Sequence, residues 1–397
     1  MEPLENLPKP DRGELLTRVI VIDALDECSP HDELESIIKS LSNLRLLNSI
    51  RLLVFVNGRV IHPLVDAFHN LDNKGVKHHR LALQTDFRQQ TEKDISLFLK
   101  ETFQEIRTRR NVLEDPWPEP DDMEKLVRLA TNPSPLFIYA STLCLFVDDG
   151  KGRKSPIKQI KIWLSQRKSA SQPDQIYRPV FHQLLLGTYD DADDRAKLSP
   201  PDDEDKDQVI FFLGSICLLS SPLSIPALAV LLDIEEDDID CWVQNLHAVL
   251  NVSQNRQDPV DILHKSFSDF ILSLKGIGIN NITIDPREIH GKLAFNCIEL
   301  MKRKLHQNIC HIGHVGPVDM ESEDMVSLSK NHISSELAYA CLNWIHHFIN
   351  SDHDIIEVKE IESFLETHLL HWIEVLALLH ELPGGPSSIG ALSKRSR

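Results

Sequence analysis

The sequence predicts an α/β fold at its start that gives way to mainly helical domains. Two apolar runs rich in β-branched residues, 17–22 and 51–56, flank a stretch with helical spacing of leucines at 31–47. Continuous apolar runs are typical of strands in a parallel sheet, and a helix is the usual connection between them. After about residue 86 the strand signal almost stops and amphipathic helical spacing dominates.

The first 87 residues are therefore expected to hold a partial parallel sheet. Besides the strands at 17–22 and 51–56, a shorter third strand is predicted at 79–84, with helices over 31–47 and after Pro63. Because their apolar residues do not alternate with polar ones, the first two strands are expected to be buried on both faces.

The remaining elements are predicted from helical spacing and turn signals. Helices are expected at 88–107, 121–131, 134–147, 156–165, 208–220, 224–232 and 236–247, and throughout 286–380. Short strands at 249–252 and 259–263 follow three of these helices, which is a winged-helix pattern. Residues 188–207 are rich in Asp and Pro and lack the glycine and glutamate of a calcium loop, so they are interpreted as an acidic linker.

These elements predict six segments. They are a partial α/β core at 1–87, a small helical domain at 88–187, the linker at 188–207, a winged-helix domain at 208–285, a C-terminal helical domain at 286–380 and a flexible tail at 381–397.

The bulk composition limits the partners and the compartment. The net charge of −18 over 397 residues disfavours nucleic acid and anionic lipid as non-specific partners. Seven scattered cysteines without a Cys-x-x-Cys pair indicate a reducing compartment. The chain has neither a signal-peptide pattern nor a run of about 18 apolar residues, so a cytoplasmic protein without a membrane span is expected.

Acidic residues follow the first strand where open parallel sheets place their ligands. The segment after residue 22 reads Asp23-Ala-Leu-Asp26-Glu27-Cys28. Asp23 is expected to hold Mg²⁺ through water, and Asp26 or Glu27 to orient or deprotonate an attacking water. Arg59 directly follows the second strand, where a guanidinium can reach a terminal phosphate.

This pattern resembles the Walker B half of a NACHT domain, from the STAND class of signalling P-loop NTPases and especially its large fungal family. The segments that carry the resemblance are Val21-Ile-Asp23-Ala-Leu-Asp26-Glu27-Cys28, Asn57-Gly-Arg59, Pro135-Leu-Phe-Ile-Tyr-Ala140, Ser221-Pro-Leu-Ser224, Leu263-His-Lys-Ser-Phe-Ser-Asp-Phe270, Leu337-Ala-Tyr-Ala-Cys-Leu-Asn-Trp344 and Phe364-Leu-Glu-Thr-His-Leu-Leu-His-Trp372. The similarity runs over roughly residues 17–380. It implies that His264 contacts the β-phosphate of bound ADP and that Pro135 packs against the nucleotide base.

Two departures from the family pattern shape the functional expectation. The family usually has Thr-Ser-Arg where this chain has Asn57-Gly58-Arg59, and no Gly-x-x-x-x-Gly-Lys followed by Ser or Thr occurs in the 397 residues. That loop supplies the backbone cradle and the lysine for the triphosphate. The chain is therefore expected to be truncated at the Walker B strand and to lack C-terminal repeats. Strand 17–22 should then pair directly with strand 51–56, be poorly held, or borrow a strand from another chain.

Three functional hypotheses remain. The first is a fragment of a NACHT-type signalling ATPase whose intact relatives bind Mg·ATP or Mg·ADP and oligomerise, whereas this chain alone binds and hydrolyses neither. The second is a helical scaffold that contacts protein partners or a full-length relative. The third is an incomplete gene model of a full NACHT-repeat protein.

Histidine and cysteine patterns give weaker predictions. Four residues of metal-binding types are close in sequence: His306, Cys310, His311 and His314. Their spacing suggests zinc, but no second paired module accompanies them. His346 and His347 are neighbours on a predicted helix, so they are expected to point to different sides and to serve as packing and surface residues.

Overall fold

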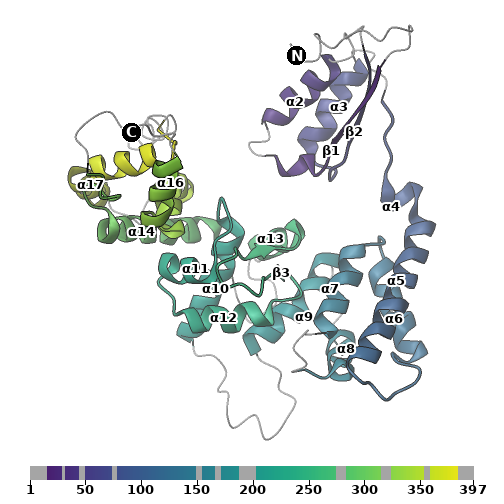
Figure 1. Ribbon diagram of the computed structural model, residues 1–397. Coiled ribbons are helices and arrows are strands. Elements are labelled where there is room, and N and C mark those ends of the chain that lie inside the picture. The colour runs from purple at the N-terminus through teal and green to yellow at the C-terminus, as the bar shows by residue number, and fades with distance from the viewer. Residues whose placement is uncertain are drawn as a thin grey trace, which may run out of the picture. The chain divides into compact units, whose positions relative to one another are not determined.

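The computed structural model describes residues 16–28, 32–43, 50–73, 78–148, 154–165, 171–186, 203–273, 283–313, 323–352 and 358–382. The chain forms two compact units, residues 1–86 and 87–397, called here the N-terminal and the C-terminal unit. Figure 1 shows the first in purple and the second from blue through green to yellow. The molecule is mostly helical, in agreement with the predicted change from α/β to mainly α.

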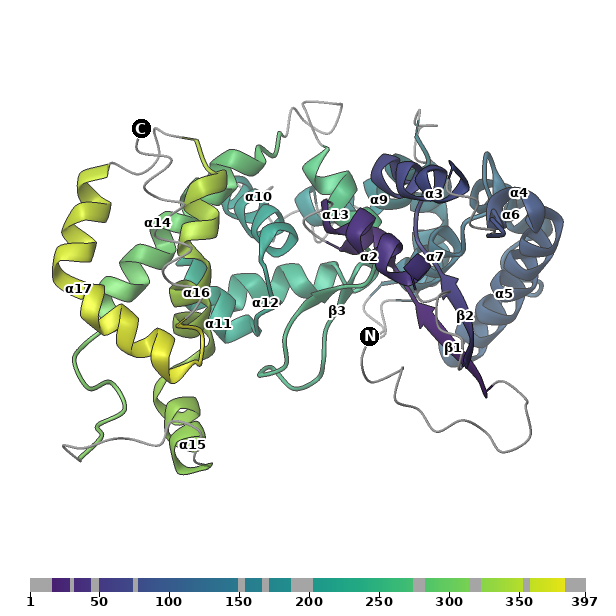
Figure 2. The same ribbon diagram turned by 90° about the horizontal axis from the view of Figure 1, so that it is seen from above.

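The described part of the N-terminal unit contains a two-stranded parallel sheet with two helices on one side (Figures 1 and 2). Strands β1 (Leu16–Ile22) and β2 (Ile50–Val56) pair in register from Leu16 opposite Ile50 to Ile22 opposite Val56. Helices α2 (Asp32–Asn43) and α3 (His62–Asn73) pack together and bury a small core of Leu25, Leu34, Ile38, Leu64, Ala67 and Leu71. The two strands therefore pair directly with each other, which is the first of the three expected arrangements.

The predicted third strand at 79–84 was wrong. Residues 78–82 form no strand, and the short helix α4 (Leu83–Asp86) begins at Leu83. The Asp86 carboxylate accepts a hydrogen bond from the backbone N–H of Ala82, at 2.8 Å. Such a local bond offers the backbone an alternative to strand pairing, and the short run carries too few apolar residues to oppose it.

The expectation that both strands are buried on both faces was also wrong. Val19, Val21, Leu53 and Phe55, called here the exposed sheet face, are 47–65% exposed. They share one face because Val19 lies opposite Leu53 and Val21 opposite Phe55. Helices α2 and α3 cover the other face, where Ile22 and Val56 pack against the small core.

The C-terminal unit begins with five helices that share one core. They are α5 (Arg88–Arg109), α6 (Pro120–Thr131), α7 (Phe137–Val147), α8 (Pro156–Ser165) and α9 (Gln172–Leu186). The Trp163 indole donates a hydrogen bond to the Tyr139 hydroxyl at 2.9 Å, which satisfies both polar groups inside this core.

A second group of helices ends in a short hairpin. It comprises α10 (Asp203–Leu218), α11 (Ile225–Leu232), α12 (Glu236–Asn245), β3 (Leu250–Asn251), β4 (Asp261–Ile262) and α13 (Lys265–Leu272). Strands β3 and β4 pair antiparallel, so the predicted helices and hairpin are present. Most of the predicted linker lies outside the described residues, but α10 extends into it from Asp203, where acidic residues favour a helix N-terminus.

Four helices complete the unit: α14 (Pro286–Lys304), α15 (Glu323–His332), α16 (Ser335–Asn350) and α17 (Val358–Leu378). Helices α14 and α16 pack side by side, and α17 contacts both. The Trp344 and Trp372 rings meet edge to face at 5.6 Å in their core. Residues 383–397 of the predicted tail lie outside the described residues. Among the described helices, none has the length and apolar character needed to cross a bilayer.

Candidate functional site

The predicted acidic site lies at the carboxyl end of the two-stranded sheet. Because β1 and β2 are parallel and in register, Asp23 and Asn57 each follow a strand at the same edge. The Asn57 side-chain amide donates to Asp23 Oδ1 at 2.6 Å, and the Ala24 backbone N–H donates to the same oxygen at 3.0 Å. These bonds fix an exposed carboxylate at the position expected for a magnesium ligand.

Asp26 and Arg59 form the second contact at this edge. The backbone N–H of Arg59 donates to Asp26 Oδ1 at 3.0 Å, and Arg59 Nε donates to Oδ2 at 2.8 Å. Asp26 is 4% exposed, whereas the Arg59 side chain is 45% exposed. Burial alone would raise the pKa of Asp26, but the hydrogen bonds and charge of Arg59 outweigh it and hold that pKa below its usual value. Asp26 is therefore a buried carboxylate that holds the guanidinium in place.

Gly58 explains why this contact is so close. A Cβ atom at residue 58 would lie 3.2 Å from Asp26 Oδ1 and 3.3 Å from Asp26 N. The glycine of the Asn-Gly-Arg sequence thus allows the backbone that follows β2 to approach the acidic turn. Sequence reasoning missed this role, although the glycine beside the arginine was visible.

The three acidic residues have different environments. Asp23 and Glu27 are exposed, whereas both carboxylate oxygens of Asp26 accept from Arg59. An exposed aspartate with hard oxygen atoms fits a hydrated Mg²⁺ ion. Of the two residues predicted to act on water, Glu27 is the accessible one.

His264 caps helix α13 in the C-terminal unit. Its Nδ1 accepts from the Ser266 backbone N–H at 3.1 Å and lies 2.6 Å from Ser266 Oγ. A neutral imidazole whose Nδ1 accepts carries its proton on Nε2, so the exposed ring presents an N–H donor. Ser266 Oγ also lies 2.5 Å from the Tyr177 hydroxyl of α9. The cap is thereby attached to the neighbouring helix.

Pro135 is buried just before α7. Helix α9 contacts both α7 and α13, so it links the segments that carry Pro135 and His264. Asp23, Asp26, Glu27 and Arg59 belong to the other unit. The structure thus brings the acidic residues and Arg59 together at the carboxyl edge of the sheet, and Pro135 and His264 are not part of this group.

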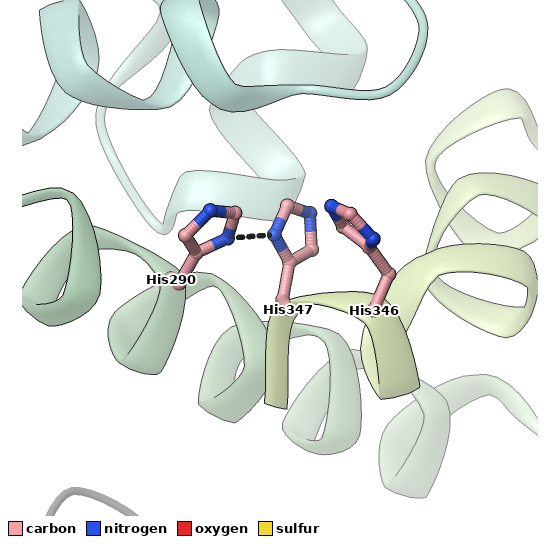
Figure 3. Close-up of side chains that lie close together, drawn as sticks. All are labelled: His290, His346 and His347. Carbon is pink, nitrogen blue, oxygen red and sulfur yellow. Dashed lines mark hydrogen bonds between the residues drawn. The ribbon is translucent and has the colours of Figure 1, made fainter. Parts of the chain in front are cut away.

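The histidines differ from the sequence expectation. His346 and His347 come together with His290 in a group whose ring nitrogens could hold a metal ion (Figure 3). His347 is buried and His346 is exposed, as expected of a packing and a surface residue. The expectation that they point to different sides of the helix was wrong, because both rings lie close to the ring of His290 on α14. Of the earlier zinc candidates, His314 lies outside the described residues, and burial raises the pKa of the Cys310 thiol.

No protein-family model matches the chain. The chain is similar to the vegetative incompatibility protein HET-E-1 of Podospora anserina, with 23% identity over 211 residues. The match covers 48% of this chain and 15% of the relative, so the chain spans a small part of that protein's length. The fungal match weakly supports the NACHT-like relationship suggested by the motifs.

Proposed function

We propose that this chain is a part of a cytoplasmic NACHT-type signalling ATPase that carries its magnesium-binding strand and its winged-helix module. We further propose that these 397 residues neither bind nor hydrolyse ATP alone. The observation that carries the proposal is the parallel β1–β2 pair, whose carboxyl edge holds Asp23 against Asn57 and Asp26 against Arg59. All seven cysteines are free thiols, which fits a reducing compartment.

The charges at this edge argue against nucleotide binding by the chain alone. The Arg59 guanidinium pairs with Asp26, and two further carboxylates, those of Asp23 and Glu27, belong to the same acidic turn. A triphosphate brought to them meets net repulsion unless Mg²⁺, a lysine and a backbone cradle offset its charge. The Gly-x-x-x-x-Gly-Lys motif that would supply this lysine is absent from the sequence.

The exposed sheet face supports a partial domain. Parallel sheets are almost always covered on both faces, and contiguous exposed apolar patches mark interaction sites. A phosphate-binding half that adds strands and a second helical layer would cover Val19, Val21, Leu53 and Phe55. The intact assembly would then have a Mg·ATP or Mg·ADP pocket.

Within that assembly each residue has a role that fits its geometry. Asp23 would hold the metal through water, and Glu27 would orient the attacking water. Asp26 would position Arg59 toward the terminal phosphate. The Nε2–H of His264 would donate to the β-phosphate, and Pro135 would pack against the base. When bound, Mg²⁺ would neutralise charge on the phosphates.

Calorimetric titration of the purified chain with Mg·ATP and Mg·ADP tests the proposal. We expect no binding in the micromolar range, and micromolar affinity would overturn it. Fusion of the chain behind a NACHT phosphate-binding half should create micromolar binding. Asp23→Asn should weaken that binding at least about tenfold, which corresponds to about 1.4 kcal/mol, whereas the surface variant Asp66→Asn should not.

A helical scaffold is the second candidate function. It is favoured by apolar side chains on the outer surfaces of α16 and α17, where Leu370 is 77% exposed and Leu342 43%. A scaffold would bind a protein partner or a full-length relative through these helices. Its binding would be weakened by Leu370→Glu and unaffected by Asp23→Ala, which distinguishes it from a nucleotide-dependent role.

A further inference from the structure

Three histidine rings converge between α14 and α16 (Figure 3). His290 lies on α14, and His346 and His347 lie on α16. Their ring centroids are 5.0–5.6 Å apart, and one ring nitrogen of each lies within 4.8 Å of one ring nitrogen of each of the others. The two helices therefore hold three imidazoles at nearly the separation that one metal ion requires.

The buried pair belongs to a hydrogen-bonded chain. The Ser220 backbone N–H donates to the Tyr339 hydroxyl at 3.1 Å, and that hydroxyl lies 2.8 Å from His347 Nε2. His347 Nδ1 lies 2.8 Å from His290 Nδ1. If the tyrosine donates its proton to Nε2, His347 keeps a proton on Nδ1 and donates it to His290. This arrangement satisfies every polar atom in the chain from Ser220 to His290 Nδ1.

The third imidazole is not part of that chain. In the described part of the molecule, the ring nitrogens of His346 have no hydrogen-bond partner. His346 is exposed, and its ring lies beside that of His347 (Figure 3). Burial lowers the pKa of His347 to about 3 and that of His290 to about 4, so both rings are neutral near pH 7, as metal ligands must be.

We propose that His290, His346 and His347 form a Zn²⁺ site at the junction of α14 and α16. Three neutral imidazoles without a carboxylate or thiolate suit zinc, and water would complete a tetrahedral shell. Zinc–nitrogen distances of about 2.0–2.1 Å place ligand nitrogens roughly 3.3 Å apart. To bind the ion, the His290–His347 pair must open by about half an ångström and His346 must move inward.

Tyr339 is suited to be the outer partner of this site. When Nδ1 of His347 binds zinc, its proton moves to Nε2 and is donated to the Tyr339 oxygen, while the Tyr339 hydroxyl turns its own proton away from the ring. No proton leaves the group in this exchange. Metal-bound histidines commonly donate their second N–H to such an acceptor. Because Tyr339 also accepts from Ser220, which follows α10, zinc would stabilise the contact between the winged-helix segment and the C-terminal helices. The proposal is independent of any nucleotide function.

Zinc titration of the metal-stripped, reduced full chain against a chromophoric chelator tests the site. We expect one Zn²⁺ per chain. His346→Ala should weaken binding at least about tenfold, because it removes the ring at the solvent side without opening the buried pair. The control His62→Ala removes an exposed imidazole on α3 and should bind as the wild type does. Equal binding by wild type and His346→Ala, or none by the wild type, would overturn the proposal.

X-ray absorption of the zinc-loaded protein gives a second readout. Three imidazole nitrogens near about 2.0 Å are expected, whereas sulfur near about 2.3 Å would assign the metal to cysteines and refute the site. Tyr339→Phe should keep all three ligands and weaken binding about tenfold through loss of the outer partner. Unchanged affinity in that variant would remove Tyr339 from the site.

Discussion

At the scale of single residues, the Asp26–Arg59 contact decides how the acidic edge is built. Asp26→Asn keeps the size of the side chain but loses the charge that holds Arg59. We expect the N-terminal unit to lose about 1–2 kcal/mol, less than for a fully buried pair because solvent screens the half-exposed guanidinium. All five tryptophans lie after residue 86, so the measurement is native-state hydrogen exchange of the β1 and β2 amides.

The matched control for this prediction is Asp66→Asn on α3. Asp66 is exposed and pairs with His62, which is also exposed, so the variant should change stability by less than about 0.5 kcal/mol. Equal effects of the two variants would show that Asp26 is no more than a surface charge.

The two buried histidines of the cluster predict a pH dependence of stability. The folded-state pKa of His347, about 3, and of His290, about 4, lie below the ordinary value of 6.5. Below pH 6.5 the unfolded chain therefore binds protons that the folded chain excludes, and stability falls as the pH falls, by up to about 1.4 kcal/mol per pH unit for each ring.

Urea unfolding of the metal-free protein between pH 7 and 5.5, followed by tryptophan fluorescence, measures this effect. His347→Gln should make the loss of stability with falling pH less steep, because the unfolded chain then has one histidine fewer that takes up a proton. The exposed control His332→Gln should keep the wild-type slope. A wild-type midpoint that does not change across this range would contradict the buried, neutral pair.

The residue identities of the candidate site were predictable in part. The positions of Asp23, Asp26 and Arg59 at one edge follow from two buried-strand patterns and the rule that parallel strands place ligands at their carboxyl ends. The sequence did not predict that Asp26 pairs with Arg59 while Asp23 stays exposed. This contact depends on the register of β1 and β2 and on the absence of a Cβ atom at Gly58. The histidine group depends on how α14 packs on α16, which no local pattern specifies.

At the scale of elements, α10 and α14 show how closely two helices can approach. A Cβ at Gly214 would lie 2.8 Å from Ile289 Cγ1 and 2.9 Å from Ile289 Cδ1. Gly214→Ala gains up to about 1 kcal/mol in helix propensity but overpacks a buried contact at a cost of about 1–3 kcal/mol. We expect a net loss of about 1 kcal/mol in the urea-unfolding free energy of the C-terminal unit.

A double-mutant cycle with Ile289→Val tests the cause. Removal of Cδ1 should reduce the penalty of Gly214→Ala, so the two changes together should cost less than their sum. Gly313→Ala is the matched control, because its Cβ would meet no atom within 4 Å. If the unfolding free energies of the two changes simply add, the contact with Ile289 is not the cause of the Gly214→Ala penalty.

Periodic segments were the predictable elements. The helices and the β3–β4 hairpin follow apolar spacing and turn residues, which act locally. Helix α9 was missed because Pro173 and Pro179 interrupt the pattern, and tertiary packing of Tyr177 and Phe181 overrides that cost. The prediction of a third strand was wrong for the opposite reason. There a local hydrogen bond from Ala82 to Asp86 determines the backbone, because tertiary packing is weak.

At the scale of the whole molecule, the two units differ in how completely their apolar residues are covered. The C-terminal unit has an extensive core, whereas the described part of the N-terminal unit has six buried apolar residues and an exposed sheet face. The same apolar runs that correctly predicted parallel strands also predicted burial on both sides. The apolar pattern of β1 and β2 thus fits strands that are covered on both faces, whereas the single layer of α2 and α3 covers one face.

Charge placed on the exposed sheet face tests whether this face is an interaction surface. Val21 and Phe55 lie opposite one another in register, so Val21→Lys with Phe55→Glu places opposite charges side by side. Because both side chains are already largely exposed, hydrogen-exchange stability of the N-terminal unit should change by less than about 1 kcal/mol. Self-association measured by light scattering should fall, since the apolar patch and the adjacent strand edges promote it.

The matched control places the same pair of charges on the covered face, as Ile22→Lys with Val56→Glu. These residues are also opposite one another in register and pack against the small core, so this variant should unfold the N-terminal unit. If both double variants destabilise equally, the face with Val21 and Phe55 is buried in solution. If the first variant leaves self-association unchanged, association does not use this face. The expected contrast, loss of association without loss of fold, would identify the exposed sheet face as an interaction surface.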